Sequence, residues 1–264
     1  MTAPIATALA GAGPLRGPLA ISISNLSKSY GPPGNRVLAL RDISLEVRRG
    51  EFHCLVGASG CGKSTLLSLI VGLERTKVGK IRLQGRPTLM FQESALFPWL
   101  TARGNVELAL RLAGARKATW RAEADRLLAL VRLTGFEHKL PHELSGGMRQ
   151  RVALARALAQ RADILLMDEP FGSLDAMTRD LLHDELEQLW AETGPTVVFV
   201  THDVREAVRL GDQVTVLTSR PGRVAAVFEV NLPRPRLVGS ADVAALTEEV
   251  TDRLRAEVRR HADD

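Results

Sequence analysis

Residues Gly57-Ala58-Ser59-Gly60-Cys61-Gly62-Lys63-Ser64-Thr65 fit the pattern G-x-x-x-x-G-K-[ST]. Glycines let a backbone curl closely enough to aim successive N–H groups at phosphate oxygens. A lysine at Lys63 reaches the β- and γ-phosphates, and a hydroxyl at Ser64 is suited to Mg²⁺. The alternative is a glycine turn that merely caps a helix, which the flanking sequence disfavours. The stretch therefore predicts a phosphate-binding loop, with Gly57, Ser59, Gly60, Cys61, Gly62, Lys63, Ser64 and Thr65 as contacts.

The flanks of this loop have the required strand–loop–helix context. The apolar run 52–56 predicts a buried strand, and the apolar spacing over 63–72 predicts a helix that ends at a glycine. Downstream, helices near 146–159, 177–190 and 204–209 alternate with strands near 164–167, 196–200, 213–218 and 224–230. Strands separated by helices predict an α/β fold with a mostly parallel sheet flanked by helices.

Two further regions depart from this alternation. Period-two patterns at 20–26 and 43–47 predict an antiparallel β subdomain, followed by short strands at 81–83 and 88–91. Helical patterns at 106–113 and 120–133 predict an inserted α-helical subdomain over about 95–160. The domain organisation expected is a disordered tail at 1–19, an ATPase domain at 20–235 and an amphipathic helix at 236–264. The apolar stripe of that helix is Val243, Leu246, Val250, Leu254 and Val258.

Composition narrows the class of protein. The 264 residues are 45% hydrophobic and 25% charged, as in ordinary soluble domains. No stretch has the ~20 apolar residues that a membrane-spanning helix needs. Two cysteines, Cys54 and Cys61, make no disulfide framework and favour a reducing compartment. The net charge of +5 is spread over scattered basic residues, so we expect a solvated basic surface and no nucleic-acid partner.

Two acidic residues follow the apolar run 164–167 and predict the reactive end of the sheet. Asp168 would hold Mg²⁺ at the carboxyl end of its strand, where ligands bind in open α/β sheets. Glu169 would orient or deprotonate the attacking water. His202 follows the next buried run and is expected to contact the γ-phosphate. Alone, the acids would suggest a capped helix start and the histidine a satisfied surface residue; the phosphate loop favours the functional interpretation.

Residues 144–151 read Leu-Ser-Gly-Gly-Met-Arg-Gln-Arg: a serine N-cap that opens a helix through two glycines, and so a second anion-binding helix terminus. Alone, this is a well-capped helix. Together with the phosphate loop it resembles the signature motif of ATP-binding cassette (ABC) transporter ATPases, and the resemblance covers about 21–230. It implies the P-loop NTPase fold, bound ATP and Mg²⁺, and hydrolysis in a head-to-tail homodimer.

The resemblance also assigns roles to single positions. Tyr30 would stack on adenine, and Gln92 would contact Mg²⁺ or water. Ser173-Leu174-Asp175 matches the loop that crosses to the other subunit, and His202 matches the switch histidine. The implied catalytic residues are Glu169, His202 and Gln92, and the metal residues are Ser64, Gln92 and Asp168. The contacts made in trans are Ser145, Gly146, Gly147 and Asp175.

Two segments look like the nitrate/sulfonate/taurine group of importers: 96–101 with Asn105-Val106, and 219–223. This likeness implies membrane permease subunits, a periplasmic or lipid-anchored solute-binding protein as an indirect partner, and a peripheral place on the cytoplasmic side of the inner membrane. Trp99 would face the permease, although exposed tryptophans more often pack. Between Gly79 and Phe91 the chain is shorter than is usual in the group, which leaves the strand register there open.

A soluble ABC ATPase, such as a cluster-assembly ATPase, is the main competitor to an importer. A catalytically dead nucleotide sensor is disfavoured by the presence of Asp168, Glu169 and His202 together. Finally, Cys61 lies beside a helix N-terminus, where thiol pKa values tend to fall, so we expect a reactive thiol that ATP protects; an inert small residue is the alternative.

Overall fold

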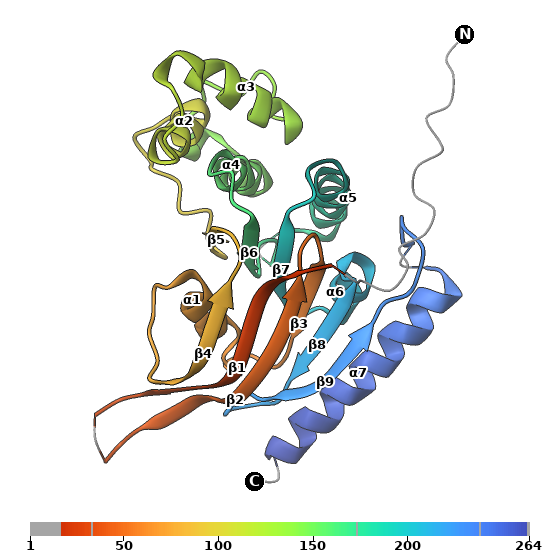
Figure 1. The fold of residues 1–264 in the computed structure, drawn as a ribbon. Coiled ribbons are helices and arrows are strands. Elements are labelled where there is room, and N and C mark those ends of the chain that lie inside the picture. Colours follow the sequence, from red (N-terminus) through yellow and green to blue (C-terminus); the bar gives the residue numbers. More distant parts are fainter. Residues whose placement is uncertain (1–16, 33, 173, 238, 263–264) are drawn as a thin grey trace.

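The structure is a computed structural model that describes residues 17–32, 34–172, 174–237 and 239–262 (Figure 1). The expected tail at 1–19 lies largely outside these residues, and the first strand begins at Leu19. Within the described part of the chain, no helix is both long enough and apolar enough to cross a membrane.

The central element is a six-stranded sheet in the order β5-β6-β7-β3-β8-β9. All neighbouring pairs are parallel except β8 with β9. β3 and β7 are buried along their whole lengths, which explains why they read as unbroken apolar runs. The strands are β3 Phe52–Val56, β5 Pro87–Met90, β6 Ile164–Asp168, β7 Thr196–Thr201, β8 Gln213–Leu217 and β9 Val224–Glu229.

A second, three-stranded antiparallel sheet has the order β2-β1-β4. Its strands are β1 Leu19–Tyr30, β2 Val37–Arg48 and β4 Val78–Leu83. The register in the short segment is now defined: Ile23 pairs with Ile81 in this sheet, whereas Thr88 pairs with Leu165 in the other. Residues 84–86 therefore carry the chain directly from one sheet to the other.

Some helices cover the parallel sheet, whereas others form a group of their own. Figure 1 shows α2, α3 and α4 gathered beyond one end of the strands, and α7 lying beside β9. The α-helices are α1 Lys63–Val71, α2 Ala102–Leu112, α3 Trp120–Leu130, α4 Gly146–Ala159, α5 Ala176–Thr193, α6 Val204–Leu210 and α7 Ala241–Ala262. Short 3₁₀ turns occur at Lys117–Thr119 and Pro141–Glu143.

Two hydrophobic cores lie on opposite faces of the parallel sheet. Alternate residues of β3 point to opposite sides: Phe52, Cys54 and Val56 enter the core beneath the helices, whereas Leu55 enters the core shared with α1 and the antiparallel sheet. At roughly 1.5–3 kcal/mol per fully buried large side chain, before chain entropy is subtracted, these two cores supply the main stabilisation. The sheet is thereby fixed on both faces, and only its ends remain open to ligands.

The C-terminal helix begins at Ala241 and packs on its own chain. Val243 and Val250 are buried in the helix-covered core, but Val258 is 43% exposed, so the predicted apolar stripe was one position too long. The loop before the helix is anchored by Arg236, which donates to the backbone carbonyls of Val208, Gly211 and Val230. This basic residue is therefore a structural clamp inside the fold, and its burial lowers the pKa of the guanidinium to about 10.

Candidate nucleotide site

The predicted phosphate loop joins the end of β3 to the start of α1. Gly60 and Gly62 adopt φ values of +74° and +104°, where an L side chain is strained. A Cβ at Gly62 would also lie 2.6 Å from Leu40 Cδ2. The loop turns back on itself, with the N–H of Cys61 donating to the carbonyl of Ala58 at 3.2 Å. These glycines are thus required by the path of the backbone, as the motif predicted.

Lys63 lies at the centre of this loop and is only 5% exposed. Its Nζ donates to the carbonyls of Gly57 at 2.8 Å and Ala58 at 3.1 Å. The same Nζ lies 3.9 Å from Oε1 of Glu169. The ammonium is therefore held between the loop and a carboxylate, at the place where an anionic phosphate group would be most strongly attracted.

Asp168 ends β6 beside this loop. Burial raises the pKa of its carboxyl group, and a hydrogen bond with the Ser64 side chain opposes that rise. The two predicted metal residues are therefore in contact. No group of three or more His, Cys, Asp or Glu side chains in the described ranges is arranged to hold a metal ion. A single carboxylate with a hydroxyl is nevertheless the donor set that Mg²⁺ uses when substrate phosphates complete its shell, so these residues fit that ion.

Glu169 and His202 meet at the ends of neighbouring strands. Nδ1 of His202 lies 3.0 Å from Oε2 of Glu169. The backbone of Glu169 has a φ of +44°, which is uncommon outside glycine, and its N–H donates to the carbonyl of Val200 at 3.0 Å. This unusual backbone turns the carboxylate toward both Lys63 and His202, which brings three sequence-predicted residues together.

Tyr30 is placed next to the loop by the end of β1. Its hydroxyl lies 3.4 Å from Oγ1 of Thr65 and donates to Glu74 at 2.7 Å. Nζ of Lys28 lies 4.8 Å from the ring centroid, so a cation already covers the ring. Sequence reasoning missed Glu74, because it lies 44 residues from Tyr30 along the chain, and it also missed Lys28, which lies two positions before Tyr30 on the same strand.

Gln92 follows β5, the neighbour of β6, and so lies toward the same end of the sheet as Asp168. Its backbone carbonyl accepts a hydrogen bond of 2.8 Å from Nε2 of Gln150 on α4. In the described residues, no hydrogen bond or ion pair joins the side chain of Gln92 to Asp168. Gln150 was not predicted as a functional residue, yet it links the Gln92 segment to the helix that begins after Ser145.

The residues that the resemblance assigns to the nucleotide of a second subunit lie together at the starts of α4 and α5. Ser145 caps α4 by accepting from the N–H of Met148 at 3.2 Å, and Asp175 caps α5 by accepting from the N–H of Thr178 at 3.0 Å. The two helix starts approach closely, since a Cβ on Gly147 would lie 2.7 Å from Thr178 Cγ2. Gly146 has more room, with Leu174 Cδ2 at 3.7 Å from its virtual Cβ. Ser173 lies outside the described residues.

Cys61 differs from its prediction. The side chain is 1% exposed, and burial raises the pKa of its thiol, although Lys63 opposes the rise. Part of this cover comes from the loop itself, since a Cβ on Gly57 would lie 2.7 Å from Cys61 Sγ, and part comes from a distant segment, since the Gly222 backbone lies against the Cys61 carbonyl. The expected depression of the thiol pKa by the helix N-terminus is therefore wrong in direction, because desolvation outweighs it.

The predicted permease-facing segment is held in a fixed shape. Asn105 is fully buried, and its side chain exchanges hydrogen bonds with the backbone of Phe97 and donates to the carbonyls of Leu100 and Thr101. Trp99 is 72% exposed, with its ring centroid 5.5 Å from that of Phe97. The buried Asn105 side chain therefore fixes the backbone of the loop from which the exposed Trp99 projects.

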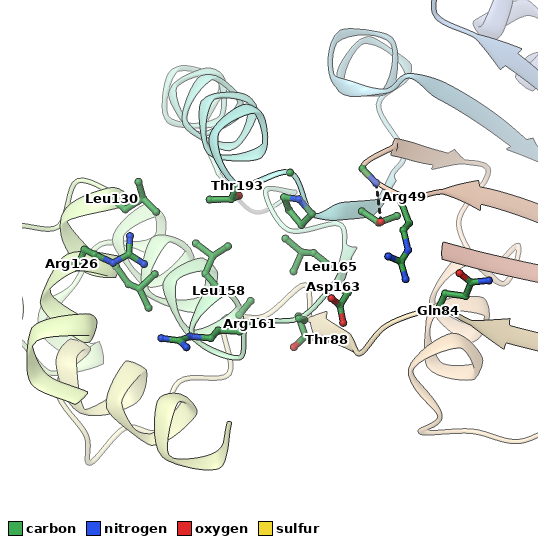
Figure 2. Close-up of a pocket in the computed structure, with 17 residues that line it drawn as sticks. Arg49, Gln84, Thr88, Arg126, Leu130, Leu158, Arg161, Asp163, Leu165 and Thr193 are labelled. Atoms are coloured by element: carbon green, nitrogen blue, oxygen red, sulfur yellow. Dashed lines mark hydrogen bonds between the residues drawn. The ribbon is translucent and has the colours of Figure 1, made fainter. Parts of the chain in front are cut away.

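A cavity of ≈ 400 Å³ lies at the opposite end of the parallel strands, where β5, β6 and β7 begin. Figure 2 shows Arg49, Arg126, Arg161 and Thr88 among the residues around it. The N–H of Gly50 donates to Thr196 Oγ1 there, at 3.1 Å. Because Asp168, Glu169 and His202 follow the other ends of these strands, this cavity is separate from the candidate nucleotide site.

The family described as ABC transporter matches residues 40–172. The chain is 43% identical to the aliphatic sulfonates import ATP-binding protein of Bacillus licheniformis, over 83% of this chain and 88% of that protein. It is 41% identical to the nitrate import ATP-binding protein of Synechococcus elongatus, over 90% and 92% of the two chains.

A solved structure has the same fold. It is a dimeric post-hydrolysis state of an ATP-binding cassette bound to ADP and phosphate, with a TM-score of 0.72 and 33% identity over 80% of this chain and 99% of that one. The P-loop NTPase fold and the capacity to hydrolyse ATP follow from these matches and from the phosphate loop. The chain belongs to the ABC transporter ATP-binding family.

Proposed function

We propose that this chain is the ATP-hydrolysing subunit of an importer, and that it works as a homodimer closed by ATP. The observation that carries the proposal is the presence of two anion-suited helix starts, at α1 and α4, in one chain. Among the described residues, no hydrogen bond or ion pair joins Ser145–Gly147 to Gly57–Thr65. A second copy brings the α4 start to the loop, and the dimeric relative bound to ADP and phosphate supports this arrangement.

Within each composite site, the residues have distinct tasks. Lys63 and the loop amides bind the β- and γ-phosphates, and Tyr30 packs on adenine beside Thr65. Ser64 and Asp168 hold Mg²⁺, which supplies charge neutralisation on the phosphates when bound. Glu169 orients the attacking water and accepts its proton, and His202 fixes Glu169 near the γ-phosphate. Gln92 links this site to α4, and Ser145, Gly146, Gly147 and Asp175 contact the nucleotide from the partner.

The transported solute is proposed to be a small anion such as nitrate or a sulfonate, or a similar solute such as taurine. Support comes from two relatives, which are an aliphatic sulfonates import ATP-binding protein and a nitrate import ATP-binding protein. The exposed Trp99 on its rigid loop supports docking to a membrane permease, beside a groove of ≈ 450 Å³ lined by Phe91, Phe97 and Leu112. A peripheral location on the cytoplasmic membrane face and an indirect solute-binding protein follow from that role.

Uptake in the source organism tests the proposal. Disruption of this coding sequence should abolish uptake of labelled nitrate, taurine, an alkyl sulfonate or bicarbonate, and the intact chain should restore it. The Glu169→Gln chain should not restore it, because hydrolysis is blocked at the water-activating residue. Normal uptake of every one of these solutes in the disrupted strain would favour a soluble ABC ATPase instead.

A further inference from the structure

A buried polar network joins α5 to the end of β7. At its centre is Glu206 of α6, which is 8% exposed. One carboxylate oxygen, Oε2, accepts a hydrogen bond of 2.6 Å from Thr201 Oγ1. The other, Oε1, lies 3.6 Å from Nε of Arg179 and 3.5 Å from Nε2 of His183. The two oxygens of one side chain therefore face two different elements.

The Thr201 side of the network fixes the turn that carries His202. Thr201 is 2% exposed, and its Oγ1 also accepts from the N–H of Asp203 at 3.0 Å. Asp203 in turn caps α6 through the N–H of Arg205 at 2.8 Å. His202 thus stands between two residues that are both held in place. The position of its imidazole relative to Glu169 depends on this turn.

The α5 side of the network reaches the loop that precedes this helix. Arg179 donates through Nη2 to the carbonyl of Leu174 at 2.9 Å, while its Nε faces Glu206. His183 lies one turn further on, is 2% exposed and packs edge-on against Phe171, with ring centroids 5.5 Å apart. A continuous set of contacts therefore runs from Leu174 through Arg179, Glu206 and Thr201 to the His202 turn.

The contacts on this side are loose. Nε of Arg179 and both ring nitrogens of His183 are buried and have no hydrogen-bond partner. Burial raises the pKa of Glu206, but His183, Thr201 and Arg179 around it bring that pKa below its ordinary value, so the carboxylate is charged. The buried Nε–H of Arg179, which faces a charged acceptor at 3.6 Å, gains free energy if a small movement shortens that distance. A small movement of α5 toward Glu206 would therefore give the network a shorter and stronger hydrogen bond.

We propose that Glu206 is a positioning residue that sets the place of His202 against Glu169, and that Arg179 makes this placement respond to the Leu174–Asp175 loop. The inference rests on the proposed function, in which that loop contacts the second copy of the chain. Contact with the partner draws Arg179 and α5 toward Glu206, and Thr201 transmits the shift to His202. Hydrolysis at one nucleotide is thereby made conditional on the interface being closed.

Steady-state ATP hydrolysis by matched variants tests the Thr201 arm. Thr201→Val removes the hydroxyl with little change of shape, whereas Thr201→Ser keeps it. We expect Thr201→Val to lower kcat by about 10–100-fold, because an active-site misplacement of about 1 Å has an effect of this size. The KM for ATP should change by less than about twofold, since ground-state binding is untouched. Thr201→Ser should retain most of the activity. Glu187→Gln removes a carboxylate from another part of α5 and serves as the control for nonspecific loss.

A double-mutant cycle separates positioning from general destabilisation. In single-turnover measurements, the effect of Thr201→Val should disappear in the His202→Ala background, because Glu206 acts only through that histidine. Arg179→Met should keep ATP-dependent dimerisation yet lower kcat, and Arg179→Lys should recover part of it.

Three results would overturn the inference, and the first two are distinguishable from the third. One is an active Thr201→Val beside an inactive His202→Ala, and another is an equal loss from Thr201→Val in the wild-type and His202→Ala backgrounds. Either refutes the positioning role of Glu206 but leaves the proposed function intact. A His202→Ala chain that hydrolyses ATP at the wild-type rate refutes the role proposed for His202 and removes the basis of both claims.

Discussion

Nδ1 of His202 lies 3.0 Å from Oε2 of Glu169, while Oε1 of the same carboxylate lies 3.9 Å from Nζ of Lys63. One side chain thus bridges Lys63, which is proposed to bind phosphate, and the residue that follows the next strand of the sheet. The left-handed backbone at Glu169 makes this bridge possible, because it turns the side chain across the ends of β6 and β7. The bridge is the geometric core of the proposed hydrolytic site.

The first prediction concerns Glu169 itself. Glu169→Gln should bind ATP normally but lower kcat by about 10²–10⁴-fold, the usual contribution of a general base. Because hydrolysis no longer opens the interface, the ATP-bound dimer should accumulate in light-scattering measurements. Glu192→Gln, which alters an exposed carboxylate on α5, should hydrolyse ATP normally. Unchanged steady-state turnover in Glu169→Gln would remove the assignment.

The second prediction concerns Ser145. Ser145→Arg should leave ATP binding by the monomer intact and prevent ATP-dependent dimerisation, because that serine is assigned to the partner's nucleotide. The substitution also removes a helix cap, which costs about 0.5–2 kcal/mol of stability. Thr101→Ala removes the comparable cap of α2 and should lower stability without affecting dimerisation. Dimer formation by Ser145→Arg at the wild-type level would contradict the assignment.

The third prediction separates the packing role of Gly147 from its proposed ligand role. Gly147→Ala should destabilise the fold, since its Cβ would lie 2.7 Å from Thr178 Cγ2. Thr178→Ser deletes that methyl group, so the double variant should regain most of the lost melting temperature. If thermal unfolding shows no loss in Gly147→Ala, or no recovery in the double variant, then the close approach of α4 and α5 is not a constraint.

The fourth prediction follows from the raised pKa of Asp168. A carboxyl group whose pKa is raised in the folded state favours folding when protonated, so its charged form destabilises the protein at pH values above that pKa. Asp168→Asn should therefore melt at a higher temperature than wild type at pH 8 without nucleotide, by about 2–4 °C for each kcal/mol. The difference should shrink as the pH falls through the folded pKa.

Asp175→Asn provides the control of opposite sign, because backbone hydrogen bonds lower the pKa of Asp175 and favour its charged form. Its melting temperature should not rise at pH 8. Calorimetry that finds Asp168→Asn no more stable than wild type at pH 8 would show that desolvation at Asp168 is not a stability cost.

The fifth prediction concerns Cys61. Since the thiol is buried and its pKa is raised, iodoacetamide should alkylate it slowly at pH 7.5, with or without ATP. An introduced cysteine in Ser145→Cys, exposed at a helix N-terminus, should react at least ~10-fold faster by mass spectrometry. Rapid labelling of Cys61 that ATP suppresses would restore the expectation drawn from the sequence.

The elements that sequence patterns predicted are those whose burial shows in the order of neighbouring residues. The fully buried run 52–56 and the alternating run 20–26 form the expected strands, because burial on both faces or on one face leaves a direct mark on residue order. Features that depend on distant segments were missed or misjudged. Glu74 against Tyr30, Gln150 against Gln92, and the Gly222 backbone against Cys61 all join parts of the chain that no local window contains.

The candidate nucleotide site was also predictable only in part. The motif around Lys63 predicted the loop, and the placement of Asp168, Glu169 and His202 at strand ends predicted their convergence, since parallel strands end at one edge. Neither pattern predicted that Glu169 faces both Lys63 and His202, because this arrangement depends on one left-handed backbone conformation at Glu169. Val258 belongs to the predicted apolar stripe but is 43% exposed, because helical spacing does not reveal where the supporting surface ends.

The most direct test of the central claim is a cross-link between the two anion-suited helix starts. One chain carries Ser59→Cys and a second, distinguishable in mass, carries Ser145→Cys, both in the Glu169→Gln background that holds ATP. Both native cysteines are buried, so a short bismaleimide joins only the introduced thiols. A composite site predicts a cross-linked heterodimer that forms only with Mg²⁺ and ATP. If the two-chain mixture gives no product while a single chain with both cysteines cross-links within itself, the nucleotide is enclosed by one subunit and the account is wrong.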